Sequence, residues 1–283
     1  PTPGTTEVPP LELVTGPDDP RVAGFRLSER ALTPRSVRRH DAPGGWFAAE
    51  GDLVVERALA AGCRPVALLT DDRRPAPVAE RLAGRVPVYA ASDGVRRAIT
   101  GLGVSLDVVG LFERPPARTA AEVVAAAHRL VVLEAVDNPT NVGAVVRSAA
   151  AMGADGLLLD RTSADPLARR ALRVSMGAAF ALPHARLDDL TDGLALVHQA
   201  GIRTVALTPD PAADELDRVA AHLGDGPVAV LLGAERTGLS APVQAAAHAR
   251  ARIPMAAGID SLNVAAAAAV ACYVLFAGGE RRR

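Results

Sequence analysis

Asn141 and Arg147 lie in the segment Asp137–Arg147, directly after the apolar stretch Val131–Leu133. In open α/β sheets, ligand groups collect beyond the carboxyl ends of strands, and Asn141 is expected there as the next helix begins. Arg147 lies six residues later, so both side chains can face one cleft if the helix begins at or just before Asn141. The alternative interpretation is structural, an N-cap asparagine followed by a surface arginine.

A second polar segment, Val230–Ser240, leaves another apolar stretch through a glycine turn at Gly233 and then presents Glu235. Glycine allows a ligand to approach the backbone closely. Glu235 can equally serve only to pair with an arginine. The segment matches neither GxGxxG nor GxxxxGK[ST], so it predicts neither a Rossmann dinucleotide site nor a P-loop.

A third segment joins Ile253-Pro254-Met255 to a polar turn at 260–263, just before the longest apolar stretch of the chain. Ser261 or Asn263 there can be a simple N-cap or can contact a ligand. The apolar stretch, Val264–Ala277, is shorter than the roughly 20 residues that cross a bilayer. It therefore predicts a helix buried on all sides, with a possible subunit interface, and no membrane association.

Composition excludes several other chemistries. All 31 basic residues are arginine, which excludes a Schiff-base lysine. The histidines show no HxH or HExxH spacing, so no metal is expected; they lie at positions 40, 128, 184, 198, 222 and 248. Cys63 and Cys272 are far apart, which is typical of reduced thiols in the cytoplasm, and no secretory signal is recognisable.

The formal net charge of −1 argues modestly against nucleic acid as a partner, because phosphate neutralisation supplies much of that affinity. Residues 21–40 are an exception with a local net charge of +5. This basic stretch predicts an RNA-binding patch or, equally, a solvated arm. The candidate RNA-binding residues are Arg26, Arg30, Arg35, Arg38 and Arg39.

The length of 283 residues favours two domains. Residues 1–20 are rich in proline, threonine and acids and predict a flexible tail. Residues 21–115 alternate helix and strand as a small α/β domain that ends at Pro115-Pro116, and 116–128 form a linker with a short helix. Residues 129–283 form the second domain. Its apolar strands, predicted at 130–134, 156–160, 204–207 and 228–232, indicate a parallel sheet covered by helices on both faces.

Taken together, the segments NVGAVVR, LLGAERTGLS and IPM…SLNVAAA resemble the three motifs of the SpoU/TrmH family of SPOUT methyltransferases, in order and with family-like spacing. The resemblance spans residues 129–283, and Ser175–Ala178 also resembles a family segment. Residues 44–69 resemble, more loosely, the ribosomal-protein-like RNA-binding domain that many members carry. The N-terminal domain is accordingly expected to bind the substrate RNA.

The resemblance implies a trefoil knot at the end of the second domain, a homodimer, and S-adenosyl-L-methionine as cofactor. It also implies methyl transfer to a ribose 2′-hydroxyl of structured RNA, ribosomal more than transfer RNA. The alternatives are a base methyltransferase of the same fold and an inactive RNA-binding scaffold. The residues implied to hold the cofactor are Leu207, Thr208, Gly233, Ile253, Met255, Ser261, Leu262 and Asn263.

The catalytic residues implied by the resemblance are Arg147, Asn141 and Glu235. Arg147 matches the family arginine held to assist deprotonation, yet a guanidinium stays protonated at ordinary pH. Phosphate positioning and alkoxide stabilisation are therefore the favoured roles. Asn141 is expected to hold the ribose or Arg147, and Glu235 to order the cleft by a hydrogen bond to either of them.

Overall fold

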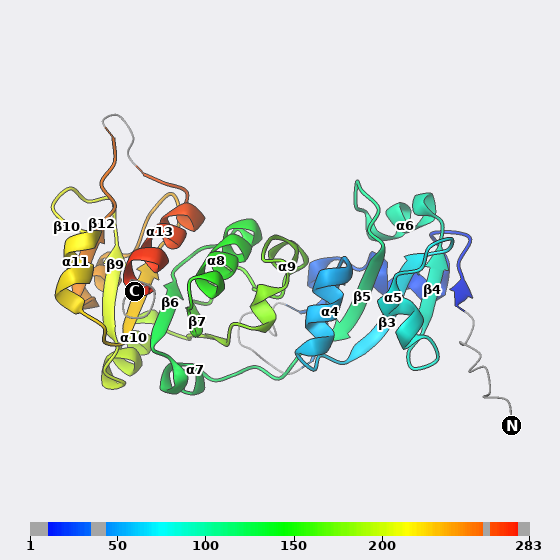
Figure 1. The fold of residues 1–283 in the computed structure, drawn as a ribbon, viewed down its shortest axis with the longest axis horizontal. Coiled ribbons are helices and arrows are strands. Elements are labelled where there is room, and N and C mark those ends of the chain that lie inside the picture. Colours follow the sequence, from blue (N-terminus) through cyan, green and yellow to red (C-terminus); the bar gives the residue numbers. More distant parts are fainter. Residues whose placement is uncertain (1–10, 35–43, 257–260, 277–283) are drawn as a thin grey trace, which may run out of the picture. The chain divides into compact units, whose positions relative to one another are not determined.

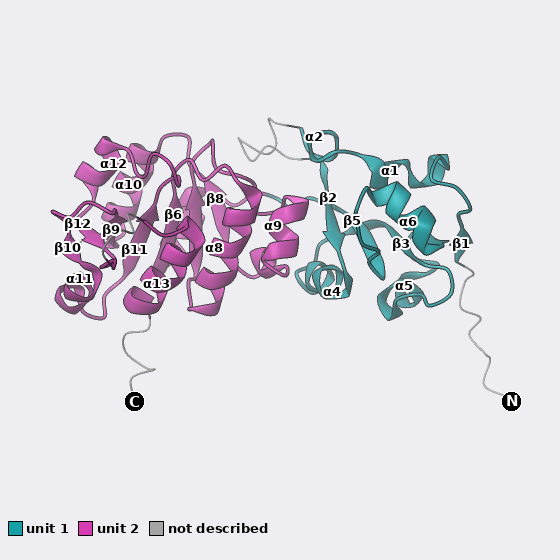
Figure 2. Ribbon diagram, turned by 90° about the horizontal axis from the view of Figure 1, so that it is seen from above, with its two compact units in different colours: residues 1–37, 43–116 teal, residues 38–42, 117–283 magenta. Residues whose placement is uncertain are grey.

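The computed structural model describes residues 11–34, 44–256 and 261–276. The chain forms two compact units, which divide after Pro116 (Figure 2). Of the described residues, 11–34 and 44–116 belong to the smaller unit, and those from 117 onward belong to the larger one. The division coincides with two adjacent prolines, which can continue neither a helix nor a central strand.

The smaller unit contains a mixed five-stranded sheet of order β1-β4-β3-β5-β2, in which β5 runs antiparallel to both neighbours. Its strands are β1 (Glu12–Leu13), β2 (Trp46–Glu50), β3 (Pro65–Asp71), β4 (Val88–Ala91) and β5 (Val108–Glu113). Its helices are the 3-10 turn η1 (Pro20–Val22), α1 (Ala23–Arg26), α2 (Glu29–Leu32), α4 (Asp52–Ala60), α5 (Pro77–Leu82) and α6 (Asp93–Thr100).

The prediction of a flexible tail is wrong for residues 11–20. Strand β1 pairs in parallel with β4, and Val14 is buried in the same apolar cluster as Phe25 and Tyr89. Arg21 secures this edge by donating to the carbonyl of Leu13. Val14 thus packs into the apolar core of the smaller unit, which the polar composition of the segment does not indicate. Residues 1–10 lie outside the described part.

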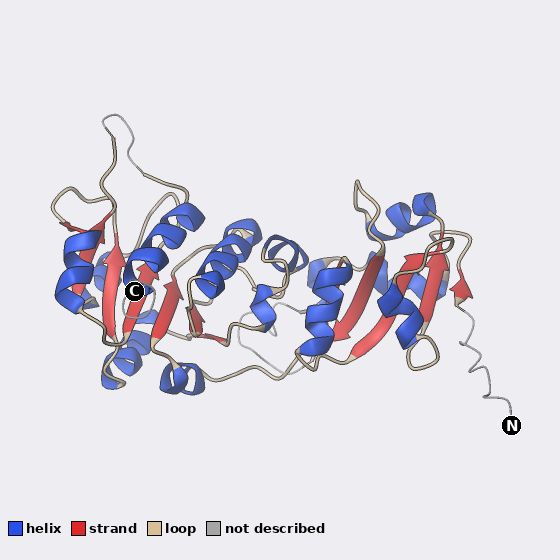
Figure 3. Cartoon of the chain, viewed as in Figure 1, coloured by secondary structure: helices blue, strands red, loops and turns tan. Residues whose placement is uncertain are grey.

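The larger unit contains a seven-stranded sheet of order β10-β12-β9-β11-β6-β7-β8, with every pairing parallel (Figure 3). Its strands are β6 (Arg129–Leu133), β7 (Gly156–Leu159), β8 (His184–Arg186), β9 (Arg203–Leu207), β10 (Asp214–Glu215), β11 (Val228–Leu232) and β12 (Ala249–Arg252). Its helices are α7 (Ala120–Ala126), α8 (Pro139–Ala151), α9 (Arg169–Val174), the 3-10 turn η2 (Ala178–Phe180), α10 (Leu190–Gln199), α11 (Leu216–Leu223), α12 (Ala241–Ala246) and α13 (Val264–Phe276).

Helices cover both faces of this sheet. Helices α8, α11 and α13 lie on one face, and α10 and α12 lie on the other (Figures 1 and 2). The prediction of a parallel sheet covered on both faces is confirmed. The strands β8, β10 and β12 were not predicted, because they are two to four residues long and lack a continuous apolar run.

Helix α7 belongs to the larger unit and is no linker. It begins with a capping box between Thr119 and Glu122, and it buries Val123 and Val124 in the core shared with α10. A capping box satisfies the first free amides of a helix and fixes where it begins. The compact unit therefore begins at residue 117 and not at the predicted 129.

Helix α13 is not buried all round, which corrects the expectation from its composition. It packs against α8 and β11, but Val270 is 38% and Tyr273 is 63% exposed. Ala266 is exposed on the same side. These three residues form a stripe, defined here as the α13 stripe, because positions four and seven residues apart share a helix face. Among the described residues, no helix has the length and apolar character to cross a membrane.

Candidate active site

A cavity of about 470 Å³ lies beyond the carboxyl ends of β9 and β11, beside the start of α13. This is the edge of an open parallel sheet at which ligands collect. The residues that the sequence assigns to the cofactor line this cavity, with the exception of Asn263; they are Leu207, Thr208, Gly233, Ile253, Met255, Ser261 and Leu262. Segments far apart in the sequence thus form one pocket of ordinary ligand size.

The loop after β11, residues 233–239, forms one wall of the cavity and is folded tightly on itself. The amide of Gly238 donates to the carbonyl of Ala234 at 2.8 Å. A Cβ on Gly233 would lie 2.2 Å from the carbonyl carbon of Gly238. Glycine is therefore required at 233 so that the two ends of the loop can touch. We call residues 233–239 the pocket loop.

Asn263 connects two of the predicted catalytic residues. Its Nδ2 donates to Oδ1 of Asn141 at 3.1 Å and also to Oε1 of Glu235. Its own Oδ1 accepts the amide of Ala265 at 3.0 Å, so Asn263 also caps α13. The prediction that Glu235 bonds directly to Asn141 or Arg147 is replaced by this arrangement, in which Asn263 bridges Asn141 and Glu235 beside the cavity.

Helix α8 begins earlier than the capping interpretation of Asn141 requires. The N-cap is Asn138, whose side chain accepts the amide of Thr140 at 2.9 Å, and Pro139 is the first helical residue. Proline suits that position because its missing amide hydrogen would have no partner there. Asn141 lies inside the first turn and is 8% exposed, which leaves its side chain for Asn263.

Arg147 does not face the same cleft as Asn141 within one chain. Arg147 is exposed whereas Asn141 is buried, and neither residue is among those that line the cavity. A separation of six residues turns the helix by about 120° net, which directs Arg147 to a different side of α8. Four residues earlier, Gly143 packs against the backbone of Ala171 in α9.

The cavity also has polar lining residues to which the sequence analysis assigned no role. Asp210 and Arg236 both contribute to its wall. Asp210 is held by Arg250, whose Nη1 lies 3.1 Å from its Oδ2. In the sequence, Asp210 is marked only by its position shortly after β9. Its partner Arg250 lies forty residues later, in β12, so the ion pair cannot be recognised from spacing.

The predicted RNA-binding arginines are only partly described. Arg26 is exposed and donates to the carbonyl of Pro17, and Arg30 is exposed on α2. Their helices bury Phe25 and Leu32, so this part of the basic stretch is anchored and is no free arm. The remaining candidates, Arg35, Arg38 and Arg39, lie outside the described residues.

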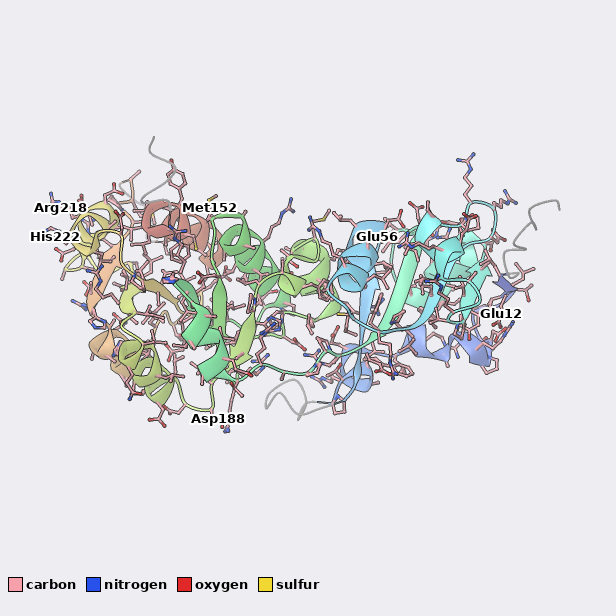
Figure 4. The ribbon with its side chains drawn as sticks, turned by 60° about the horizontal axis from the view of Figure 1, so that its bottom comes forward. Glu12, Glu56, Met152, Asp188, Arg218 and His222 are labelled. Atoms are coloured by element: carbon pink, nitrogen blue, oxygen red, sulfur yellow. The ribbon has the colours of Figure 1, made fainter. Side chains whose placement is uncertain are left out.

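Two of the described histidines lie together, away from the cavity. His198 and His248 contact each other edge-to-face and share hydrogen bonds with the buried Thr204, whereas His222 is exposed on α11, one turn after Arg218 (Figure 4). Desolvation and the neighbouring His248 lower the pKa of His198. Within the described ranges, the structure contains no cluster of three or more histidine, cysteine or acidic side chains that could hold a metal ion.

Comparison with known proteins gives a consistent result. The model of the SpoU rRNA Methylase family matches residues 128–273. A tRNA/rRNA methyltransferase of Mycobacterium tuberculosis, itself uncharacterised, is 41% identical over 267 residues, which cover 93% of this chain and 91% of that protein. A relative of Mycobacterium bovis has the same identity and coverage.

Solved structures match both units. A crystal structure of an RNA 2′-O ribose methyltransferase is 26% identical, covers 95% of this chain and 99% of its own, and has a TM-score of 0.74. The AdoMet-bound rRNA methyltransferase of Sinorhizobium meliloti is 29% identical, with coverage of 94% and 97% and a TM-score of 0.76. The SpoU methyltransferase AviRb of Streptomyces viridochromogenes is 26% identical, with coverage of 90% and 96% and a TM-score of 0.72.

Proposed function

The chain belongs to the SpoU rRNA methylase family and is an S-adenosylmethionine-dependent RNA methyltransferase; we propose that it methylates a ribose 2′-hydroxyl, in ribosomal rather than transfer RNA. The observation that carries this proposal is the bridge from Asn141 through Asn263 to Glu235 beside the cavity. Similarity to a 2′-O ribose methyltransferase and to an rRNA methyltransferase, each over more than nine-tenths of the chain, supports both parts.

The residues around the cavity fit S-adenosylmethionine. Its volume of about 470 Å³ is in the range of small-molecule sites. The glycine at 233 brings backbone groups to the surface of the pocket, and apolar side chains such as Leu207 and Met255 alternate with the hydroxyls of Thr208 and Ser261. We propose that these residues hold the cofactor. The cofactor supplies an electrophilic methyl group on a sulfonium.

Asn263 determines how Asn141 can act. Because Oδ1 of Asn141 accepts from Asn263, its Nδ2 is left to donate to an oxygen of the substrate. Glu235, which also accepts from Asn263, holds that amide in this orientation. Fixing the ribose oxygen in line with the methyl group accounts for much of the acceleration expected of a displacement reaction. RNA is required, because DNA lacks the 2′-hydroxyl.

Arg147 is proposed to hold a phosphate and to stabilise the alkoxide as the hydroxyl loses its proton. A guanidinium is permanently charged and has no acceptor, so it is suited to this role and not to that of a base. We expect Arg147→Ala to abolish transfer while S-adenosylmethionine binding, measured by calorimetry, stays unchanged. Arg218→Ala, at an exposed arginine of α11, is the control. A fully active Arg147→Ala enzyme would refute this mechanism.

The product of the reaction tests the substrate proposal directly. Ribosomal and transfer RNA from a methylase-deficient strain are incubated with methyl-labelled cofactor, and the modified nucleosides are then separated. We expect label on a 2′-O-methyl nucleoside derived from ribosomal RNA. Label on a base would replace the proposal with a base methyltransferase, and label on transfer RNA alone would contradict the choice of ribosomal RNA. Absence of both transfer and cofactor binding would favour an inactive scaffold.

The α13 stripe supports the proposal of a homodimer. An exposed tyrosine and valine on one helix face are typical of a surface that a second subunit covers. A dimer that brings Arg147 of one copy toward the cavity of the other would complete the site. We expect wild-type protein to sediment as a dimer and Tyr273→Glu to sediment as a monomer; an unchanged dimer would exclude this interface.

Three further features belong to the same proposal. We propose that the smaller unit binds the substrate RNA and that its arginines, including Arg26 and Arg30, contact phosphates. The free, buried cysteines Cys63 and Cys272 support a cytoplasmic location. The trefoil knot stays a prediction for the segment that leads into α13, of which residues 257–260 lie outside the described part.

A further inference from the structure

Glu134 lies at the end of β6, directly before the segment that carries Asn138 and Asn141, and no part of the proposed chemistry uses it. Its amide continues the β6–β11 ladder by donating to the carbonyl of Leu232 at 2.9 Å. Its side chain therefore lies beside the strand end from which the pocket loop departs. Oε2 of Glu134 accepts the amide of Ser240, immediately after that loop, at 2.8 Å.

The bond to Ser240 fixes the far end of the pocket loop. The near end is fixed by β11, and the middle is held by the contact of Gly238 with Ala234. Two further contacts hold residues 237–239: Leu239 is buried, and Gln244 donates to the carbonyl of Leu239 at 2.9 Å. A carboxylate that accepts a backbone amide makes a charge-assisted bond, which is stronger than a neutral one.

Two connections thus join the segment after β6 to the pocket loop and to Ser240, the residue that follows it. One is the bond of Glu134 to Ser240, and the other is the bridge from Asn141 through Asn263 to Glu235. We propose that Glu134 is a positioning residue that holds the pocket loop closed against bound S-adenosylmethionine and, through Glu235, sets the orientation of Asn141. This inference rests on the proposed function of the cavity as the cofactor site.

The bond can be removed from either side. Glu134→Ala deletes the acceptor, whereas Glu134→Gln keeps an oxygen that can accept the same amide. Ser240→Pro deletes the donor and fits the backbone, because Ser240 has a φ of −64°, which proline adopts. Ser240→Ala is the matched control: the hydroxyl makes no capping bond in the structure, and alanine keeps the amide.

We expect Glu134→Ala and Ser240→Pro each to weaken S-adenosylmethionine binding by about tenfold, which corresponds to about 1.4 kcal/mol. The double variant should be no worse than either single one, because both changes remove the same bond. Glu134→Gln and Ser240→Ala should bind within about threefold of wild type. Dissociation constants are measured by calorimetry well below the unfolding transition, so that a loss of stability alone does not change them.

Three outcomes would overturn the inference: unchanged binding in Glu134→Ala, additive losses in the double variant, or a loss in Glu134→Gln as large as in Glu134→Ala. Ala267→Phe places a large side chain in the cavity from α13. This variant tells whether Glu134 lacks the proposed role or whether the cavity is not the cofactor site. If Ala267→Phe still binds the cofactor normally, the cavity is not its site. If Ala267→Phe abolishes binding and Glu134→Ala does not reduce it, only the role of Glu134 is wrong.

Discussion

Replacement of Asn263 separates its two structural roles. Asn263→Ala removes the cap of α13, which costs about 1 kcal/mol. It also leaves Oδ1 of the nearly buried Asn141 without its partner, which costs a further 1 to 3 kcal/mol, roughly. The lost bond to Glu235 adds little, because that carboxylate is exposed. We therefore expect the free energy of unfolding of the larger unit to decrease by about 2 to 4 kcal/mol.

Asn263→Asp keeps the cap but not the amide donor. An aspartate oxygen accepts the amide of Ala265 as well as the asparagine oxygen does. Asn141 can then turn its own amide group toward the introduced carboxylate, which restores a hydrogen bond but uses the donor that we assign to the substrate. The new carboxylate also lies beside that of Glu235, a contact between like charges that solvent screens because Glu235 is exposed. The free energy of unfolding should therefore decrease by less than in Asn263→Ala, because the cap is kept, whereas kcat should fall about 100-fold.

The assays are urea unfolding followed by circular dichroism, and methyl transfer to ribosomal RNA under single-turnover conditions. Binding of S-adenosylmethionine to the Asn263→Asp variant should change much less than kcat, because Asn263 reaches the cavity only through Glu235. An Asn263→Asp enzyme with the wild-type rate would refute the reasoning, since it would show that the donor of Asn141 is not needed. Equal loss of stability in both variants would refute the capping role.

Three further predictions concern packing and ionisation. Gly143→Ala should destabilise the larger unit by about 1 to 3 kcal/mol in urea unfolding, because a Cβ there would lie 2.5 Å from the carbonyl oxygen of Ala171. Burial and His248 lower the pKa of His198 in the folded protein, so below about pH 6.5 the unfolded chain binds a proton that the folded protein does not. The free energy of unfolding should therefore decrease as the pH falls below about 6.5. His198→Gln should flatten this dependence. Burial raises the pKa of Cys272 to about 12, so iodoacetamide at pH 8 should label it only after unfolding.

A control or a contradicting outcome checks each of these predictions. Gly94→Ala, at a helical glycine with open space around its Cβ position, should leave stability nearly unchanged, and a stable Gly143→Ala protein would contradict the close packing of α8 on α9. An equal pH dependence in His198→Gln and wild type would assign it to other groups. Rapid labelling of Cys272 in the folded protein would show that α13 opens on the time scale of the reaction.

The sequence by itself determined the secondary structure where a segment is buried on both faces. Strand β11 coincides with the predicted 228–232, and β6 differs from its prediction by one residue at each end, because continuous apolar runs leave little choice of register. The order of the three motifs also indicated the family, which the family model and the relatives confirm. Such information is local or is carried by residue identity, and it needs no knowledge of contacts.

Only the tertiary structure decided how the polar residues pair. The bridge from Asn263 to Asn141 joins positions 122 residues apart, and the bond from Ser240 to Glu134 joins positions 106 apart. Neither can be read from spacing along one helix or strand. The burial of Val14 against β4 and the exposure of Tyr273 likewise cannot be read from the local sequence. Burial and pairing depend on which surfaces the sheet order brings together, and that order is a property of the whole chain.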